Sequence, residues 1–450
     1  MIPINKTNFA LAPLPADDSG ENGTERLTLI VKGACTLNPD GSTTPWPQAE
    51  QPEFQGDLRY GDDGGNSLYY ATDVEDWKPK VDVILRAACH PPEGEPVERC
   101  DVHLEMPGRV KTLRVFGDRF WQQDPEGIWR MSAPQPFTGI PIRWERSFGG
   151  MLNAANPLGK GEDMDPMSDP EDPVYPLPNV EDPANPIRMP EDAPVPVSFA
   201  PVPEFYETRE RKQGTRDLRW ATFFAPRPPK DFDPHFYNAA PDDQQLERLR
   251  GYESFVVRNM HPTEPRFEIG LPDLRPRAFY VLADDKTQTL NEVPLTLDTV
   301  HIDLIENTVT VLWRGGFDHD FDEITESIDF VYLAEEVASE RYRDIQWHQN
   351  NFAEDAAIYQ EALEAIKTTA EDVEVREFGP ILKQIVKVLG EVGASTALVD
   401  KVSAAPDMES LSDTLQAAMS EQEAQVHALS EEIKVKYNVE PDVEGSGSAS

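Results

Sequence analysis

The chain of 450 residues carries 82 acidic and 41 basic side chains, which gives a formal net charge of −41. Nucleic acid is excluded as a direct ligand because its phosphates require a basic surface, and an anionic membrane is disfavoured for the same reason. The acidity either keeps the protein soluble or complements a basic partner.

The N-terminal region and the cysteines indicate a compartment. Residues 1–6 lack the charged region and apolar run of a signal peptide, and no stretch approaches the roughly 20 apolar residues of a membrane-spanning helix. Cys35, Cys89 and Cys100 show no spacing typical of metal sites, so buried thiols are expected rather than disulfides. These features predict a cytoplasmic protein.

Residues 25–132 alternate apolar and polar side chains with a period of two. Val102, Leu104 and Met106, for example, are separated by His103 and Glu105. Such alternation is typical of strands with one buried face. We therefore expect a mainly β domain over residues 1–333, an antiparallel sandwich or open barrel, and the 42 Pro residues predict long loops within it.

The first unusual run is WERSFGG at 144–150 with NPLGKG at 156–161. Its Gly, Asn and Pro residues predict shaped loops, which often carry recognition residues. On a strand, Trp144, Arg146 and Phe148 would share a face and form either a buried cation–π ladder or an interface anchor. The glycines lack the spacing of a phosphate-binding loop, so no nucleotide cofactor is expected.

Residues 162–192 form an acidic, Pro-rich stretch with four Glu-Asp pairs and few basic residues. It has too little apolar area to offset the entropy of ordering. We expect a loop excursion over the surface that is held to the domain only around residues 175–179.

The second unusual run is DFDP at 231–234 with FYNAAPDDQ at 236–244. Asp231, Asp233 and His235 could bind a divalent ion or act as paired carboxylates, or the two aspartates could cap backbone N–H groups around Phe232 and Pro234. Neither run contains a recognisable catalytic set. We therefore expect a binding protein with no catalytic residue, no metal and no cofactor.

Further strands are expected near 266–269 and 278–282, in a hairpin over 301–313 that turns at Glu306-Asn307, and over 327–333. The aspartates at 318–322 resemble the start of a calcium loop only superficially, because Glu323 stands where the loop requires Gly. A solvated turn is the expectation there.

After residue 334 the Pro density falls, and Ala, Glu, Gln and Leu recur at helical spacing. Amphipathic helices are expected over 352–366, 378–389 and 411–433. Their apolar stripes must pack against each other, the β domain or another chain. We expect a helical region over 334–440 and a flexible tail over 441–450.

The two runs supply the candidate partner contacts. These are Trp144, Arg146, Phe148, Asn156, Asp231, Phe232, Asp233, Phe236, Asn238, Asp243 and Gln244. Phe236 is expected to be an exposed contact, whereas Gly149, Gly150, Asn156 and Gly159 are expected to set the backbone shape.

Several short sequence motifs, taken in their order along the chain, resemble those of a bacterial family that is catalogued as a domain of unknown function. Members of this family occur beside type VI secretion genes. Besides the two runs, the resemblance rests on WP at 46–47, LPNVE at 177–181, FAP at 199–201, GTRD at 214–217 with Trp220, GYE at 251–253 and LP at 271–272. It covers about residues 5–330. The chain departs from the family in having FAP instead of FGP, Arg216 instead of an aromatic residue, and a helical region instead of pentapeptide repeats.

The resemblance implies a non-catalytic adaptor/chaperone that holds a secreted effector in the cytoplasm and helps load it onto the spike proteins VgrG and PAAR. The acidity of the chain leads us to expect a basic bound region in the effector. Two other classes stay open: a carboxylate- or metal-dependent hydrolase that uses Asp231, Asp233 and His235, and a structural module that self-assembles through its C-terminal helices.

Overall fold

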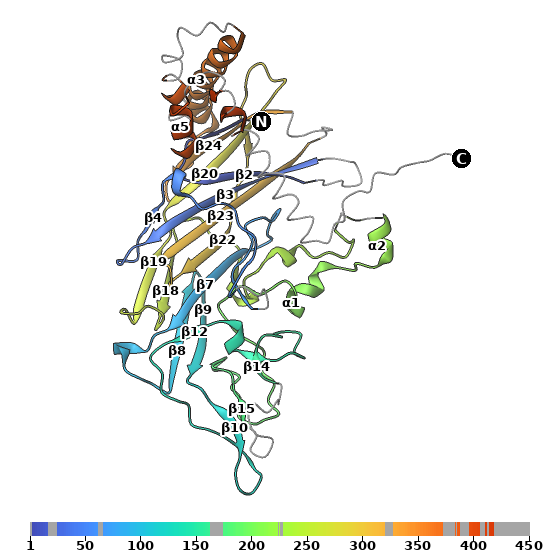
Figure 1. Cartoon of the computed structure of the whole chain (residues 1–450), viewed down its shortest axis with the longest axis vertical. Helices are drawn as coiled ribbons and strands as arrows, with labels where there is room; N and C mark the ends of the chain where they lie inside the picture. The colour runs from blue at the N-terminus through green and yellow to red at the C-terminus, as the bar shows by residue number, and fades with distance from the viewer. Residues whose placement is uncertain are drawn as a thin grey trace, which may run out of the picture.

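The structure is a computed structural model. It describes residues 2–16, 25–61, 66–162, 174–223, 225, 228–319, 327–371, 383, 385–387, 396–405, 410–411 and 414–417. Strands outnumber helices in the described part (Figure 1). The prediction of a mainly β protein with a helical C-terminal region is confirmed, and the described strands do not close into a barrel.

The largest sheet has eight strands, and its central order is β12-β7-β22-β23-β3-β2. These strands are β12 (Ile140–Ile142), β7 (Val81–Cys89), β22 (Thr296–Asp303), β23 (Thr308–His319), β3 (Glu25–Leu37) and β2 (Ala10–Ala16), with β17 (Gln245–Leu246) beside β7 and β4 (Thr43–Pro45) beside β3. The predicted hairpin is present as β22 and β23, and Asn307 in its turn has a φ of +54°. The pair β7 and β22 is parallel, which alternation alone does not distinguish from antiparallel pairing.

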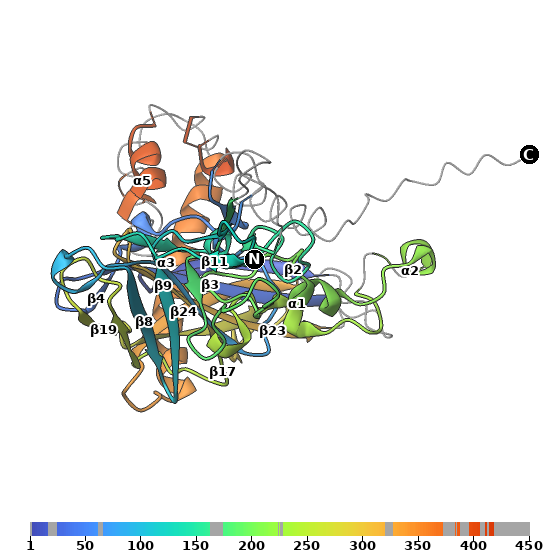
Figure 2. The same cartoon turned by 90° about the horizontal axis from the view of Figure 1, so that it is seen from below.

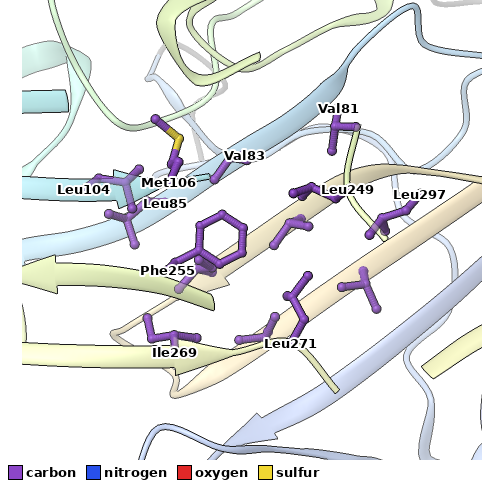
Figure 3. Packing of buried hydrophobic residues seen from close by; sticks show 14 of the residues in the cluster. Val81, Val83, Leu85, Leu104, Met106, Leu249, Phe255, Ile269, Leu271 and Leu297 are labelled. Carbon is purple, nitrogen blue, oxygen red and sulfur yellow. The ribbon is translucent and has the colours of Figure 1, made fainter. Parts of the chain in front are cut away.

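A five-stranded sheet shares its hydrophobic core with the largest sheet. Its strands are β16 (Val180–Glu181), β9 (Arg109–Phe116), β8 (Arg99–Met106), β18 (Ser254–Arg258) and β19 (Arg266–Gly270). Figure 3 shows apolar side chains of β7 and β22 gathered with those of β8, β18 and β19. Along β8 every second residue is buried, as the alternation of Val102, Leu104 and Met106 predicts. The three cysteines are buried and free, as expected.

A four-stranded sheet packs against the first helix that follows the β domain. It consists of β1 (Ile2–Asn5), β24 (Ile328–Val337), β20 (Leu274–Leu282) and β21 (Asn291–Val293), and β1 runs parallel to β24. One face contributes to the main core, while the other contacts helix α3 (Ile345–Glu371). Phe352 of α3 is buried there against the rings of Phe330 and Tyr332. The sequence left three packing partners open for the helices: each other, the β domain or another chain. Helix α3 packs against the β domain.

The predicted boundary at residue 334 falls inside β24. This strand continues to Val337, because its pairing with β20 extends to Leu274 and buries the charged Glu336 beside Arg275. The predicted helix over 352–366 begins earlier, at Ile345. A second helix, α5 (Thr396–Ser403), packs with Ile385 and Leu411. Most of the predicted helices over 378–389 and 411–433, and the whole tail over 441–450, lie outside the described residues.

Among the helices that the structure describes, none combines the length and the apolarity needed to cross a lipid bilayer.

Of the predicted excursion over 162–192, residues 163–173 lie outside the described part, while 174–192 pack more closely than expected. They form β15 (Val174–Pro176) and β16, and they bury Ile187 beyond the predicted attachment point.

Shorter elements build the loops. They are β5 (Leu58–Arg59), β6 (Leu68–Tyr70), β10 (Phe120–Gln123), β11 (Trp129–Met131), β13 (Phe148–Gly149), β14 (Lys160–Gly161), α1 (Glu207–Glu210), α2 (Leu218–Phe223) and several 3-10 helices. Several loops cover the outer face of the largest sheet, so that β7 is buried on both faces along nearly its whole length.

Candidate partner-binding surface

Asn156 holds the first predicted loop together. Its side-chain nitrogen Nδ2 donates to the carbonyl oxygens of Trp144, at 3.0 Å, and Phe148, at 2.8 Å. Its Oδ1 accepts a hydrogen bond of 2.8 Å from the hydroxyl of Tyr206. The residue is fully buried, so these bonds are shielded from water. One side chain therefore closes the loop over 144–161 and ties it to the segment that precedes α1.

The glycines around Asn156 are required by close backbone contacts. Gly149 has a φ of +152°, and a Cβ atom there would lie 2.2 Å from the carbonyl oxygen of Asn156. A Cβ atom at Gly159 would lie 2.5 Å from Asn156 Nδ2. The prediction that these residues set the backbone shape is confirmed for Gly149, Asn156 and Gly159 and stays a prediction for Gly150.

The substitution Gly149→Val should therefore lower the free energy of unfolding by about 2 to 4 kcal/mol, because it adds a backbone clash to an unfavourable φ. The matched control is Gly127→Val, where φ is +77° but no atom lies within 4 Å of the added Cβ. Urea unfolding followed by tryptophan fluorescence measures both. Equal losses for the two variants would show that φ alone matters and that the contact with Asn156 does not.

Trp144, Arg146 and Phe148 do not share the face of a strand, and that prediction is wrong. Trp144 and Arg146 lie in a one-turn 3-10 helix, η3 (Trp144–Arg146), which ends where Ser147 donates to the Trp144 carbonyl. The helical turn sends the aromatic side chains to different clusters. Trp144 packs edge-on against Tyr206, whereas Phe148 is buried with Trp121 and other residues.

The second predicted loop is bonded to β7. Asp82, at the start of that strand, accepts hydrogen bonds from Asn238 Nδ2, at 2.9 Å, and from the backbone nitrogen of Ala239, at 2.8 Å. Gln244 Nε2 donates to the carbonyl oxygen of Val83 at 2.7 Å. Asn238 and Gln244 are almost fully buried. These two predicted contact residues therefore attach the loop to the sheet.

Two buried lysines complete this attachment. Lys78 Nζ lies 2.8 Å from the Asp82 carboxylate. Lys111 Nζ donates to Asp243 Oδ1, at 2.7 Å, and to Gln244 Oε1, at 2.8 Å. Burial lowers the pKa of Lys111, although the Asp243 carboxylate opposes that effect. These partners are not evident from the sequence, because Lys78 precedes β7 and Lys111 lies on β9, and both are far in sequence from the loop that they hold.

Phe236 is buried rather than exposed, so its prediction as an exposed contact is wrong. Arg209 of α1 donates to the Phe236 carbonyl oxygen at 2.9 Å and to that of Val202 at 2.8 Å. The guanidinium also stands over the Phe236 ring. These contacts lock the side chain between α1 and the second loop, and a local pattern of aromatic residues does not reveal them.

Asp231 and Asp233 cap backbone groups, as one of the two predicted alternatives states. Asp231 accepts hydrogen bonds from Thr215 N, at 2.9 Å, and from Thr215 Oγ1, at 2.7 Å. Asp233 accepts from His235 N at 3.0 Å and lies 2.8 Å from its ring nitrogen Nδ1. The backbone hydrogen bonds lower the pKa of both carboxyl groups.

Within the described residues, no group of three or more His, Cys, Asp or Glu is placed to hold a metal ion. From residue 320 on, the predicted turn at 318–323 lies outside the described part.

The predicted contact residues thus separate by exposure. Asp231, Asp233 and Asp243 are exposed, Arg146 and Phe232 are half-buried, and the others are buried. A role in partner contact stays a prediction for all of them, and for the buried residues it would be indirect, through the shape of the loops.

The first loop exposes two apolar side chains that sequence analysis did not single out. Met151 is 82% exposed and Leu152 is 86% exposed. The same loop is bonded to the start of α1, where Glu207 N donates to the Ala154 carbonyl at 2.8 Å. In Figure 1, α1, α2 and β14 lie on one side of the main sheets. In the sequence, the feature that could have indicated this exposed site is the pair of adjacent apolar residues, Met151 and Leu152, between turn-forming residues.

Comparisons with known proteins place the chain in a family. No curated protein matches the chain. No solved structure matches it either. The profile of a family described as "Uncharacterized protein conserved in bacteria (DUF2169)" matches residues 22–314, more than half of the chain, and this range contains both loops. The chain therefore belongs to the bacterial DUF2169 family.

Proposed function

We propose that this protein is a non-catalytic adaptor/chaperone that binds a type VI secretion effector in the cytoplasm and helps load it onto the VgrG and PAAR spike proteins. The proposal is supported by the short loop motifs that follow one another along the chain and resemble those of such adaptors. The observation that carries it is the first loop, in which Asn156 fixes the backbone while Met151 and Leu152 are largely exposed.

The physical argument concerns preorganisation. A fixed loop loses little backbone conformational entropy on binding, and burial of its exposed apolar side chains releases water from apolar surface. Binding residues are commonly placed on loops that a rigid scaffold positions. The buried bonds of Asn156, Gln244 and Lys111 supply that rigidity here. The net charge of −41 favours a basic bound region in the effector.

The direct test is co-expression of the full chain with the product of the neighbouring open reading frame. A stable complex of fixed stoichiometry that survives size-exclusion chromatography is the expected result. If that product and the spike proteins all elute separately from this chain at micromolar concentration, the proposal is wrong.

The double substitution Met151→Ser with Leu152→Ser should weaken effector binding by about a hundredfold, because each large apolar side chain buried at an interface contributes on the order of 1.5 kcal/mol. The melting temperature should stay unchanged, since both side chains are exposed. Isothermal titration calorimetry measures the affinity. The matched control replaces Val110 and Ile305, two exposed apolar residues elsewhere, by Ser. If the control weakens binding equally, the loop is not the contact surface.

A further inference from the structure

Residues 214–231 are called the arm; the structure describes 214–223, 225 and 228–231 of them, and the described ends of the arm meet at one point of the body of the protein. Asp231 closes the base of the arm through its two hydrogen bonds to Thr215. Gly214, with a φ of +74°, permits this closure, because a Cβ atom there would lie 2.9 Å from Asp231 Oδ1. Lys212 accepts a backbone hydrogen bond from Asp233 just inside the base. The arm therefore projects from a fixed base, and both views show α2 at its outer end, away from the sheets (Figures 1 and 2).

The helix of the arm exposes apolar side chains. Leu218 is 83% exposed and Phe223 is 74% exposed, and no residue of α2 is buried. Asp217 Oδ1 caps the helix by accepting from Trp220 N at 2.8 Å. A helix of six residues is far below the length that is stable in water by itself, so its stability is expected to increase when an apolar partner covers it.

The charge of the arm is opposite to that of the chain. It contains four basic residues, Arg216, Arg219, Arg227 and Lys230, and two acidic residues, Asp217 and Asp231, whereas the whole chain has twice as many acidic as basic residues. Both acidic side chains of the arm accept hydrogen bonds from within it. Arg219 is exposed and lies four residues before Phe223, so the two share one face of α2.

We infer that the arm is a docking element for an acidic protein segment that carries apolar side chains. Apolar groups of the partner pack on Leu218 and Phe223, while its carboxylates pair with Arg219. The arm therefore favours an acidic partner, whereas the acidic body of the protein favours a basic one. This inference does not depend on the proposed function, because it concerns the chemistry of one surface only.

The test uses the full chain and a display library of random short peptides as the probe. Selection should enrich peptides in which Asp and Glu flank Leu, Phe or Trp. A synthetic copy of an enriched peptide, measured by fluorescence anisotropy, should lose about tenfold or more in affinity with Arg219→Glu and with the double substitution Leu218→Ser and Phe223→Ser. Its affinity should fall with added salt. The same peptide with Lys in place of Glu should prefer the Arg219→Glu variant to the natural chain.

Two controls keep the result specific. The substitutions Val110→Ser and Ile305→Ser should leave peptide affinity unchanged, and all the variants should keep their melting temperatures because the replaced side chains are exposed. Selection without an excess of acidic residues, or equal binding to the arm variants, would overturn the inference. So would a dimer of the natural chain that the Leu218 and Phe223 substitutions convert to a monomer, because a second copy would then occupy the arm. Effector co-expression is a separate assay, so each proposal can fail alone.

Discussion

Replacing Asp82 by Ala should lower the free energy of unfolding by about 3 to 5 kcal/mol, because it leaves a buried lysine without its counter-ion. Lys78 Nζ lies 2.8 Å from this carboxylate, and both side chains are almost completely inaccessible. The substitution also removes the acceptor for Asn238 Nδ2 and for the backbone nitrogen of Ala239. Urea unfolding measures the loss, and hydrogen exchange over residues 238–244 should show that the second loop has loosened.

The neighbouring ion pair provides a matched control. Lys80 Nζ lies 3.0 Å from Glu247, but the Glu247 side chain is largely exposed. The substitution Glu247→Ala should therefore cost less than about 1 kcal/mol, since solvent screens the pair. The double substitution Lys78→Met with Asp82→Leu should recover part of the stability that Asp82→Ala loses, because no charge stays buried alone. Equal losses for Asp82→Ala and Glu247→Ala would contradict the assignment of Asp82 as the residue that attaches the loop.

Replacing Glu336 by Ala should have an effect of similar size, about 3 to 5 kcal/mol, on the attachment of α3. Glu336 accepts hydrogen bonds from Arg275 Nη2 at 2.6 Å, Arg277 Nη1 at 2.9 Å and His348 Nε2 at 2.8 Å. Its removal leaves two buried guanidinium groups with fewer counter-ions and releases the first turn of the helix. The expected result is a lower melting temperature together with faster proteolysis within residues 345–371. Unchanged proteolysis there would show that the apolar contacts of Phe352 hold α3 alone.

The same cluster should make stability depend on pH. Burial lowers the pKa of His348, although its hydrogen bond with Glu336 opposes that effect. Burial alone would raise the pKa of Glu336, but hydrogen bonds from Arg275 and His348 outweigh it and hold the pKa below its ordinary value. Both groups thus contribute stability that is fully present above their unfolded-state pKa values, 6.5 and 4.5, and that is lost as the pH falls.

The substitution His348→Gln isolates the histidine part, because Gln can still donate to Glu336 and does not titrate. The difference in melting temperature between the natural chain and this variant should shrink as the pH is lowered from about 7.5 to about 5. A difference that stays constant over this range would show that His348 is not the group whose protonation weakens the attachment of α3.

The sequence by itself determined the buried faces of several strands and the glycine-dependent loops. Alternation in β8 predicts its buried face, because successive side chains of a strand point to opposite sides. Gly149 and Gly159 predict close backbone contacts, because a residue without Cβ is needed where chains approach. Asp231 and Asp233 behave as local caps, within reach of short-range reasoning. The family membership also follows from the sequence, through the match over residues 22–314.

Only the tertiary structure decided which of these residues are accessible. Asp82 and Asn238 are 156 residues apart, and nothing in either neighbourhood predicts that they meet. Phe236 has the local features of an exposed contact, yet Arg209 and the second loop bury it, while Met151 and Leu152 are left in solvent. Local sequence patterns indicate which backbone conformation a segment prefers and how its side chains alternate between two faces. Burial of a loop depends on which distant segments the topology of the sheets brings over it, and therefore on the whole fold.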